Sequence, residues 1–131
     1  MKVLALDYGA ARTGVAVSDP SGTLARPLTV VEAAASKAGL GRLAEIVAAE
    51  GPERIVVGLP LTLRGERGAQ ALETERFVDA LRAALDVPIE AYDERFTTTL
   101  AARGNGEAAE DARAAAHLLE SYLAWSSSRR D

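Results

Sequence analysis

The chain has 131 residues, 48% of them hydrophobic, which suits one domain that buries roughly two thirds of its unfolded surface. It has no cysteine and one histidine, His117, which excludes disulfides, thiolate zinc sites and histidine-rich metal clusters, so any metal must be held mainly by oxygen. The net charge of -4 argues against a non-specific nucleic-acid coat protein but leaves room for a local basic cleft.

The first residues predict three consecutive strands. Lys2–Asp7 is a short apolar run, and Thr13–Ser18 is a second run of small and β-branched residues, so the two predict a β-hairpin. A third strand, Leu24–Val31, follows the turn-forming residues Asp19-Pro20-Ser21-Gly22. The chain is thus expected to open with an antiparallel meander.

A helix and a central strand are predicted next. Apolar residues recur at helical spacing over Ser36–Glu50, and Gly51-Pro52 ends that helix because proline lacks the required N–H. Arg54–Gly58 is a continuous β-branched run without polar alternation, which is typical of a parallel strand buried on both faces.

The rest of the sequence completes an α/β fold. Ala69–Leu85 predicts a helix, Ile89–Asp93 a strand, and Ala108–Trp125 a final helix. We therefore expect a mixed five-stranded sheet, a three-strand antiparallel meander plus two parallel strands, flanked by helices. Residues 1–125 would form the single domain, and 126–131 a polar C-terminal tail that frays.

No segment resembles a membrane span or an export signal. The sequence lacks any run of ~20 uncharged apolar residues, and its first apolar run reaches Asp7 too soon for a signal peptide. We therefore expect a soluble, cytoplasmic protein that has no membrane partner.

Acidic residues stand at two strand ends. Asp7 continues the alternation of Val3 and Ala5, where an apolar side chain would be expected, so it needs a cation or hydrogen-bond donors. Asp93 and Glu94 close a later strand and face opposite ways if strand geometry persists, so only one of them can point to a shared site. Each feature alone also fits an ordinary turn, cap or ion pair.

A third carboxylate, Asp111, heads the apolar stripe of the last helix. Small alanines would let this helix approach the sheet closely and bring Asp111 near Asp7, although an acidic residue in a first turn also simply stabilises a helix. Three carboxylates without histidine are the ligand set preferred by Mg²⁺ or Mn²⁺. Such a site suits hydrolysis of phosphodiester bonds.

Four blocks of sequence resemble, in order and over nearly the whole chain, the signature motifs of the YqgF/RuvX family of pre-16S ribosomal RNA nucleases and Holliday-junction-resolvase homologues. The blocks are Asp7-Tyr8-Gly9-x-x-Arg12-x-Gly14-Val15-Ala16, Gly58-Leu59-Pro60 followed by Gly65, Asp93-Glu94-Arg95-Phe96-Thr97-Thr98, and Asp111-x-x-Ala114-Ala115-x-x-Leu118-Leu119-x-x-Tyr122-Leu123. The resemblance implies a ribonuclease H-like fold, a nucleic-acid substrate, and Asp7, Glu94 and Asp111 as catalytic metal ligands. Asp93 or Glu110 could replace an assigned ligand.

Substrate binding is expected around the same motifs. Gly9 and Thr97 belong to them, and Arg12, Arg64 and Arg95 are candidates to grip substrate phosphates. Arg67 is a further candidate for phosphate binding, but a role in a solvated loop fits it equally well. Compared with the family pattern, the segment before Asp111 is short and has one basic residue, Arg103, which bears on how the substrate is held.

Several functions remain open. The leading hypothesis is a nuclease for structured RNA in processing of the 16S rRNA precursor. A Holliday junction resolvase or DNA nuclease uses the same chemistry on branched DNA, and a resolvase would be expected to act as a homodimer. A non-catalytic RNA-binding, transcription-associated factor is an alternative of another class. An actin-like ATPase is disfavoured because it needs two such domains.

Overall fold

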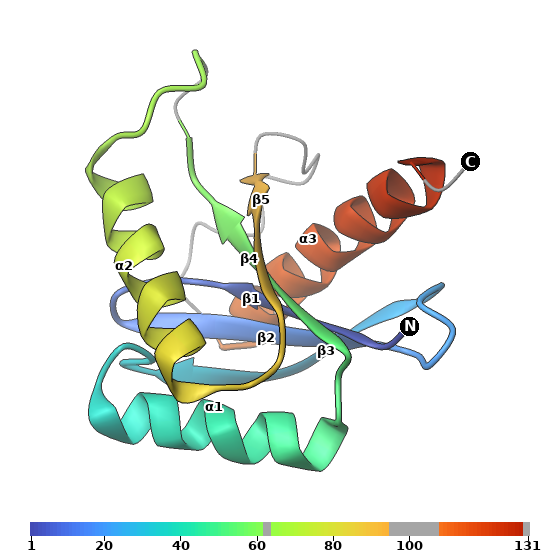
Figure 1. The fold of residues 1–131 in the computed structure, drawn as a ribbon, viewed down its shortest axis with the longest axis horizontal. Coiled ribbons are helices and arrows are strands. Elements are labelled where there is room, and N and C mark those ends of the chain that lie inside the picture. Colours follow the sequence, from blue (N-terminus) through green and yellow to red (C-terminus); the bar gives the residue numbers. More distant parts are fainter. Residues whose placement is uncertain (62–63, 95–107, 130–131) are drawn as a thin grey trace.

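A computed structural model describes residues 1–61, 64–94 and 108–129 and has the predicted order of elements (Figure 1). In chain order they are β1 (Val3–Asp7), β2 (Arg12–Ser18), β3 (Ala25–Glu32), α1 (Lys37–Glu50), β4 (Arg54–Leu59), α2 (Ala69–Ala84), β5 (Ile89–Asp93) and α3 (Ala108–Arg129). The strands form one sheet in the order β3-β2-β1-β4-β5. β1 pairs antiparallel with β2 and parallel with β4, which confirms the meander joined to two parallel strands.

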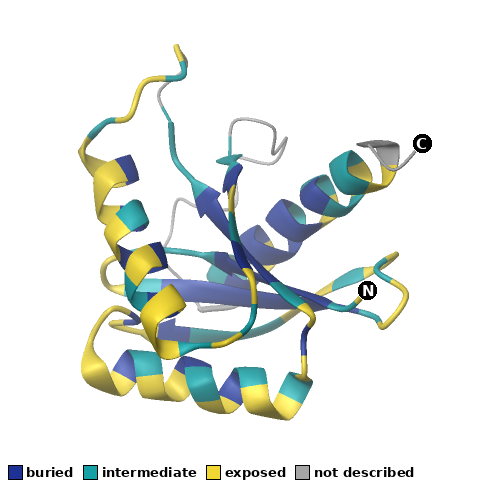
Figure 2. Cartoon of the chain, in the orientation of Figure 1, coloured by how far each residue is buried: buried dark blue, intermediate teal, exposed yellow. Residues whose placement is uncertain are grey.

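Strand alternation divides the core into two apolar layers. Leu4, Leu6 and Val57 pack on one face of the sheet against α1 and α2, whereas Val3 and Ala5 face the opposite way, against α3. Figure 2 shows buried residues along the central strands and on the faces of the helices that meet them. The sheet is therefore the middle of three layers, with α1 and α2 on one side and α3 on the other.

The limits of α1 follow from its flanking residues. Ser36 caps the first turn, where its Oγ accepts a hydrogen bond from the Gly39 N–H at 3.0 Å. Gly51 ends the helix in a left-handed conformation, with φ 61°, and its N–H donates to the Val47 carbonyl. The sequence prediction of this helix is confirmed, except that Ser36 is its cap rather than its first helical residue.

The last helix is longer than predicted. It was expected to end at Trp125, but α3 continues through the serines to Arg129. This segment contains neither glycine nor proline, so nothing in its sequence forces the helix to end. None of the helices in the described ranges is long and apolar enough to cross a membrane.

Candidate active site

The functional candidates meet where β1, β4 and β5 end. Asp7 is the last residue of β1 and pairs with Gly14 of β2. On the other side of β1, Leu6 is in register with Val57, which places Asp7 beside Gly58 of β4. Asp7 thus lies between two strand positions that carry no side chain, so other elements can approach the sheet closely on both sides of it.

The half-buried Asp7 shares a face with Val3 and Ala5, which pack against α3. The same alternation puts Gly14 and Gly58 on this face, because Ala16 and Val56 belong to the α3 layer. The first turn of α3 therefore lies over the corner of the sheet where Asp7 ends its strand.

Glu94, rather than Asp93, is placed at this corner. A Cβ built on Gly58 would lie 3.0 Å from Glu94 Oε1, so the Glu94 carboxylate sits over the glycine that neighbours Asp7. Alternation along β5 puts Asp93 on the same side as Ile89, which packs in the layer of α1 and α2. Of the two adjacent acids, Glu94 is the one on the face shared with Asp7.

Asp111 reaches the corner through a close backbone contact. A Cβ on Gly14 would collide with the carbonyl group of Asp111, so only glycine lets α3 approach β2 this closely. The Asp111 Oδ2 atom is shielded from solvent and lies 3.0 Å from Arg12 Nε. The alignment falls short of a hydrogen bond, so we describe the contact as an ion pair.

These carboxylates border one corner without forming a closed cluster. Among the described residues, no three histidine, cysteine, aspartate or glutamate side chains are gathered closely enough to hold a metal ion. Mutual repulsion of like charges and the pairing of Asp111 with Arg12 both favour this spacing. Glu110 is also half-buried at the start of α3, with its Oε2 shielded from solvent, and it remains an alternative to Asp111.

Of the residues predicted to bind substrate, Arg12 is the one placed at the corner by a contact. Gly9 belongs to the tight turn after β1, since a Cβ there would lie 2.5 Å from the Arg12 carbonyl oxygen. Arg64 is exposed between β4 and α2, and Arg67 forms an ion pair with Glu75. Arg95 and Thr97 lie outside the described residues.

Tyr8 packs locally. Its ring stacks on Phe77 with centroids 4.3 Å apart, and its hydroxyl donates a hydrogen bond to Glu73 Oε1 at 3.2 Å. Burial, and then the neighbouring Glu73, raise the pKa of Tyr8, so the hydroxyl remains a donor at neutral pH. No local pattern around Tyr8 points to Glu73, which lies 65 residues later, on α2.

An open cleft of about 380 Å³ lies beside the corner. Among the described residues, its lining includes two carboxylates, Glu73 and Glu94, and no lysine or arginine. The residues that line it are Tyr8, Gly9, Ala10, Pro60, Gln70, Glu73, Thr74 and Glu94. The site therefore opens to solvent next to Glu94, on an acidic side.

The chain is similar to known proteins over most of its length. A family model described as "RuvX: Holliday junction resolvase" matches residues 1–125. A protein of Chloroflexus aggregans is 48% identical over 76% of this chain and 70% of its own length, and one of Syntrophomonas wolfei is 37% identical over 94% of each. Both carry the curated name "Putative pre-16S rRNA nuclease".

The fold is similar to that of T. thermophilus RuvC, solved in complex with a Holliday junction substrate. The two chains are 23% identical, the match covers 96% of this chain and 95% of the other, and the TM-score is 0.61. This similarity confirms the predicted ribonuclease H-like fold.

Proposed function

Because the chain belongs to the RuvX family of Holliday junction resolvases, we propose that it is a metal-dependent nuclease that hydrolyses phosphodiester bonds in structured nucleic acid. The observation that carries this proposal is the convergence of Asp7, Glu94 and Asp111 on one face of the sheet. Three separate elements deliver them, and the missing side chains of Gly14 and Gly58 make the approach possible. Carboxylates that converge on one face of a sheet suit the binding of a divalent cation.

The residues at the corner suit a divalent cation. The candidate metal ligands are all carboxylate oxygens. The shielded Asp111 Oδ2 forms an ion pair with Arg12 but no well-aligned hydrogen bond. Asp7, Glu94 and Asp111 would hold Mg²⁺ or Mn²⁺, which supplies activation of a water molecule and charge stabilisation at the scissile phosphate. Arg12, next to Asp111, would bind and orient that phosphate.

The proposed substrate is the 16S rRNA precursor. Both relatives described above are named for it, and the match to the Syntrophomonas wolfei protein extends over nearly the whole chain. Branched DNA is the second candidate, because the family model is described as a Holliday junction resolvase. A resolvase that cuts two symmetric strands is expected to act as a two-fold dimer, which a mass measurement in solution would detect.

The test is cleavage of four labelled substrates: a structured RNA with a precursor-like stem, a single-stranded RNA, a duplex DNA and a four-way DNA junction. Each is incubated with Mn²⁺, Mg²⁺ or EDTA, with the native chain and with Asp7→Asn. We expect metal-dependent cleavage of the structured RNA that Asp7→Asn abolishes. Preferential cleavage of the junction would favour the resolvase. RNA binding without cleavage under any condition would overturn the nuclease proposal in favour of a binding factor.

A further inference from the structure

A second open groove, of about 440 Å³, lies between β3 and α1 and is lined in part by Arg12. Its lining contains two guanidinium groups, Arg12 and Arg42, and one carboxylate, Glu32. In the cleft next to Glu94, the described part of the chain contributes two carboxylates and no cation. The charges on the two hollows therefore differ in sign, and a phosphodiester backbone is attracted to the groove with the arginines.

Arg12 connects this groove to the corner of the sheet where Asp7, Glu94 and Asp111 lie, here called the active corner. Its Nε contacts Asp111, and the same side chain also lines the groove. Arg42 lies one helical turn after Gly39 on α1, on the face that borders the groove. Its ion pair with Glu45 is exposed, with Nη1 and Oε1 3.6 Å apart, so it holds Arg42 only weakly.

The backbone around the groove is firmly held. The Ala33 N–H donates to the Ala11 carbonyl at 2.9 Å, which ties the start of β2 to the segment before α1. Ala33 has a φ of 46°, in the region that favours glycine, and its carbonyl accepts hydrogen bonds from both the N–H and the Oγ of Ser36. A Cβ on Gly39 would collide with that carbonyl, so α1 is packed directly onto the segment. These contacts hold the backbone of Arg12 and the helix that carries Arg42 in a fixed arrangement.

We propose that the groove between β3 and α1 holds the sugar-phosphate backbone of the nucleic-acid strand where it leaves the active corner, with Arg42 as a phosphate contact beyond Arg12. The inference rests on the proposed function and adds the path of the strand. A contact of this kind carries no sequence information, so it contributes equally to all sequences of the same shape. Glu32, in the same groove, opposes binding.

The experiment measures binding in the Asp7→Asn background, so that the probe stays intact. The probes are a fluorescein-labelled RNA hairpin, a second hairpin of the same shape but different sequence, and a four-way DNA junction, each titrated over a series of KCl concentrations. The variants are Arg42→Ala, Arg42→Lys and Glu32→Gln. Arg76→Ala, which removes an exposed arginine of α2 outside the groove, is the matched control. Thermal midpoints verify that each variant is folded.

For Arg42→Ala we expect about tenfold weaker binding of the preferred probe, and a salt dependence shallower by about one unit of log K per log[salt]. The loss should be equal for the two hairpins. Arg42→Lys should recover part of the affinity, Glu32→Gln should increase it about threefold, and Arg76→Ala should leave it unchanged.

Two results would overturn the inference in different ways. If Arg42→Ala weakens binding no more than Arg76→Ala does, the strand does not follow this groove, while binding itself leaves the nuclease proposal standing. If the Asp7→Asn chain binds none of the probes at low salt, the proposed function fails and this inference fails with it.

Discussion

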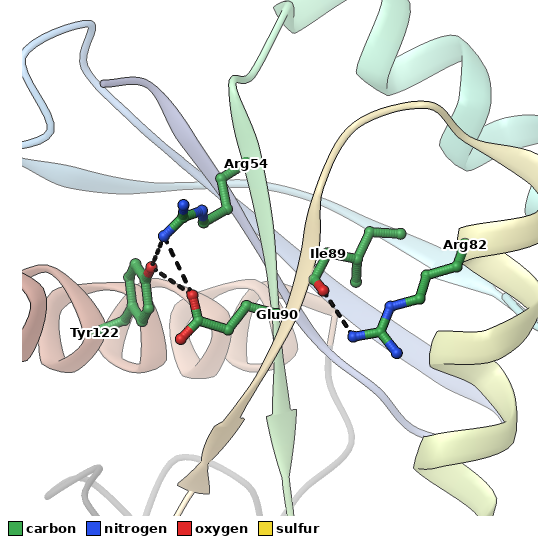
Figure 3. A network of polar contacts seen from close by, with 5 residues as sticks. All are labelled: Arg54, Arg82, Ile89, Glu90 and Tyr122. Atoms are coloured by element: carbon green, nitrogen blue, oxygen red, sulfur yellow. Dashed lines mark hydrogen bonds and ion pairs between the residues drawn. The ribbon is translucent and has the colours of Figure 1, made fainter.

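The two ends of α3 differ in how their charges are matched. Near its C-terminal end, Arg54 Nη1 donates a hydrogen bond to the Tyr122 hydroxyl at 2.9 Å and lies 3.3 Å from Glu90 Oε1. The Tyr122 hydroxyl in turn donates to the same oxygen at 2.9 Å (Figure 3). The guanidinium, the carboxylate and the hydroxyl there satisfy one another's charges and hydrogen bonds. The network links α3 to the starts of β4 and β5.

The other end, here called the unbalanced end, brings several carboxylates together. Asp7, Glu94 and Asp111 border one corner, and Arg12 Nε lies 3.0 Å from Asp111 Oδ2. Like charges held near one another cost stability until a cation joins them. The end with Arg54, Glu90 and Tyr122, here called the balanced end, therefore holds the helix in place. Function is expected at the unbalanced end.

The largest effect is expected on the cleavage rate, from a substitution at the unbalanced end. Asp7→Asn should lower the cleavage rate roughly a thousandfold, about 4 kcal/mol in activation free energy, because it removes a proposed metal ligand. The loss of rate should exceed any change in the free energy of unfolding, since the substitution keeps the shape of the side chain. Rates and chemical denaturation are measured on the same preparation. Asp93→Asn, on the opposite face of the sheet, is the control and should keep most of the activity.

Gly14→Ala should separate α3 from the sheet at the same end. The added methyl group would collide with the Asp111 carbonyl, so we expect a loss of about 3 kcal/mol in the free energy of unfolding. Gly41→Ala is the matched control, because a Cβ there meets nothing within 4 Å. It lies in the interior of α1 and should stabilise the chain by about 0.5–1 kcal/mol. Equal effects of the two variants would contradict the close approach of α3.

A smaller effect is expected at the balanced end. Tyr122→Phe removes the hydroxyl but keeps the ring, which is 2% exposed, so the free energy of unfolding should fall by about 1 kcal/mol. Arg54 and Glu90 would still pair with each other. Urea denaturation measures the loss, and cleavage assays should show a rate within about twofold of the native chain, because the proposed active site lies at the other end of α3. A rate loss as large as that of Asp7→Asn would refute this separation.

The smallest effect concerns the turn between β2 and β3. Asp19 accepts hydrogen bonds from Ser21 Oγ and from the N–H groups of Leu24 and Thr23, which lower its pKa from 3.8 to about 2. A lowered pKa means that the stabilisation is complete above pH 3.8 and is lost as the pH falls through about 2. Native chain and Asp19→Asn should therefore differ in thermal midpoint at pH 6 and converge near pH 2. A constant difference over this range would contradict the assignment.

The fold could be predicted because its signals are local. The buried run Arg54–Gly58, the helix end at Gly51-Pro52 and the alternation of Val3, Ala5 and Asp7 each depend on neighbours in sequence, and the structure confirms all three. The predicted end of α3 at Trp125 is too early, because the serines that follow are helical rather than a polar tail. Serine has only a modest cost within a helix, so its presence does not end one.

The site was harder to predict because its geometry depends on glycines that face other elements. Gly14 and Gly58 appear in the sequence as turn or strand residues, and nothing local shows that they face Asp111 and Glu94. The residues alone left Asp93 and Glu94 as alternatives, and strand register was needed to assign their faces. The partners of Tyr122, Arg54 and Glu90, are 68 and 32 residues away, so this network has no local signal.

The aromatic packing at the balanced end gives the protein an internal optical reporter. Trp125 is the only tryptophan of the chain, and its ring centroid lies 5.5 Å from that of Tyr92 and 5.8 Å from that of Tyr122. At such distances, excitation energy is transferred efficiently from the tyrosines to the indole. Fluorescence excited at tyrosine wavelengths and emitted by Trp125 therefore reports whether α3 is seated on β5. Because Trp125 lies far along the helix from Asp111, substrate and metal at the active corner can be titrated without touching the fluorophore.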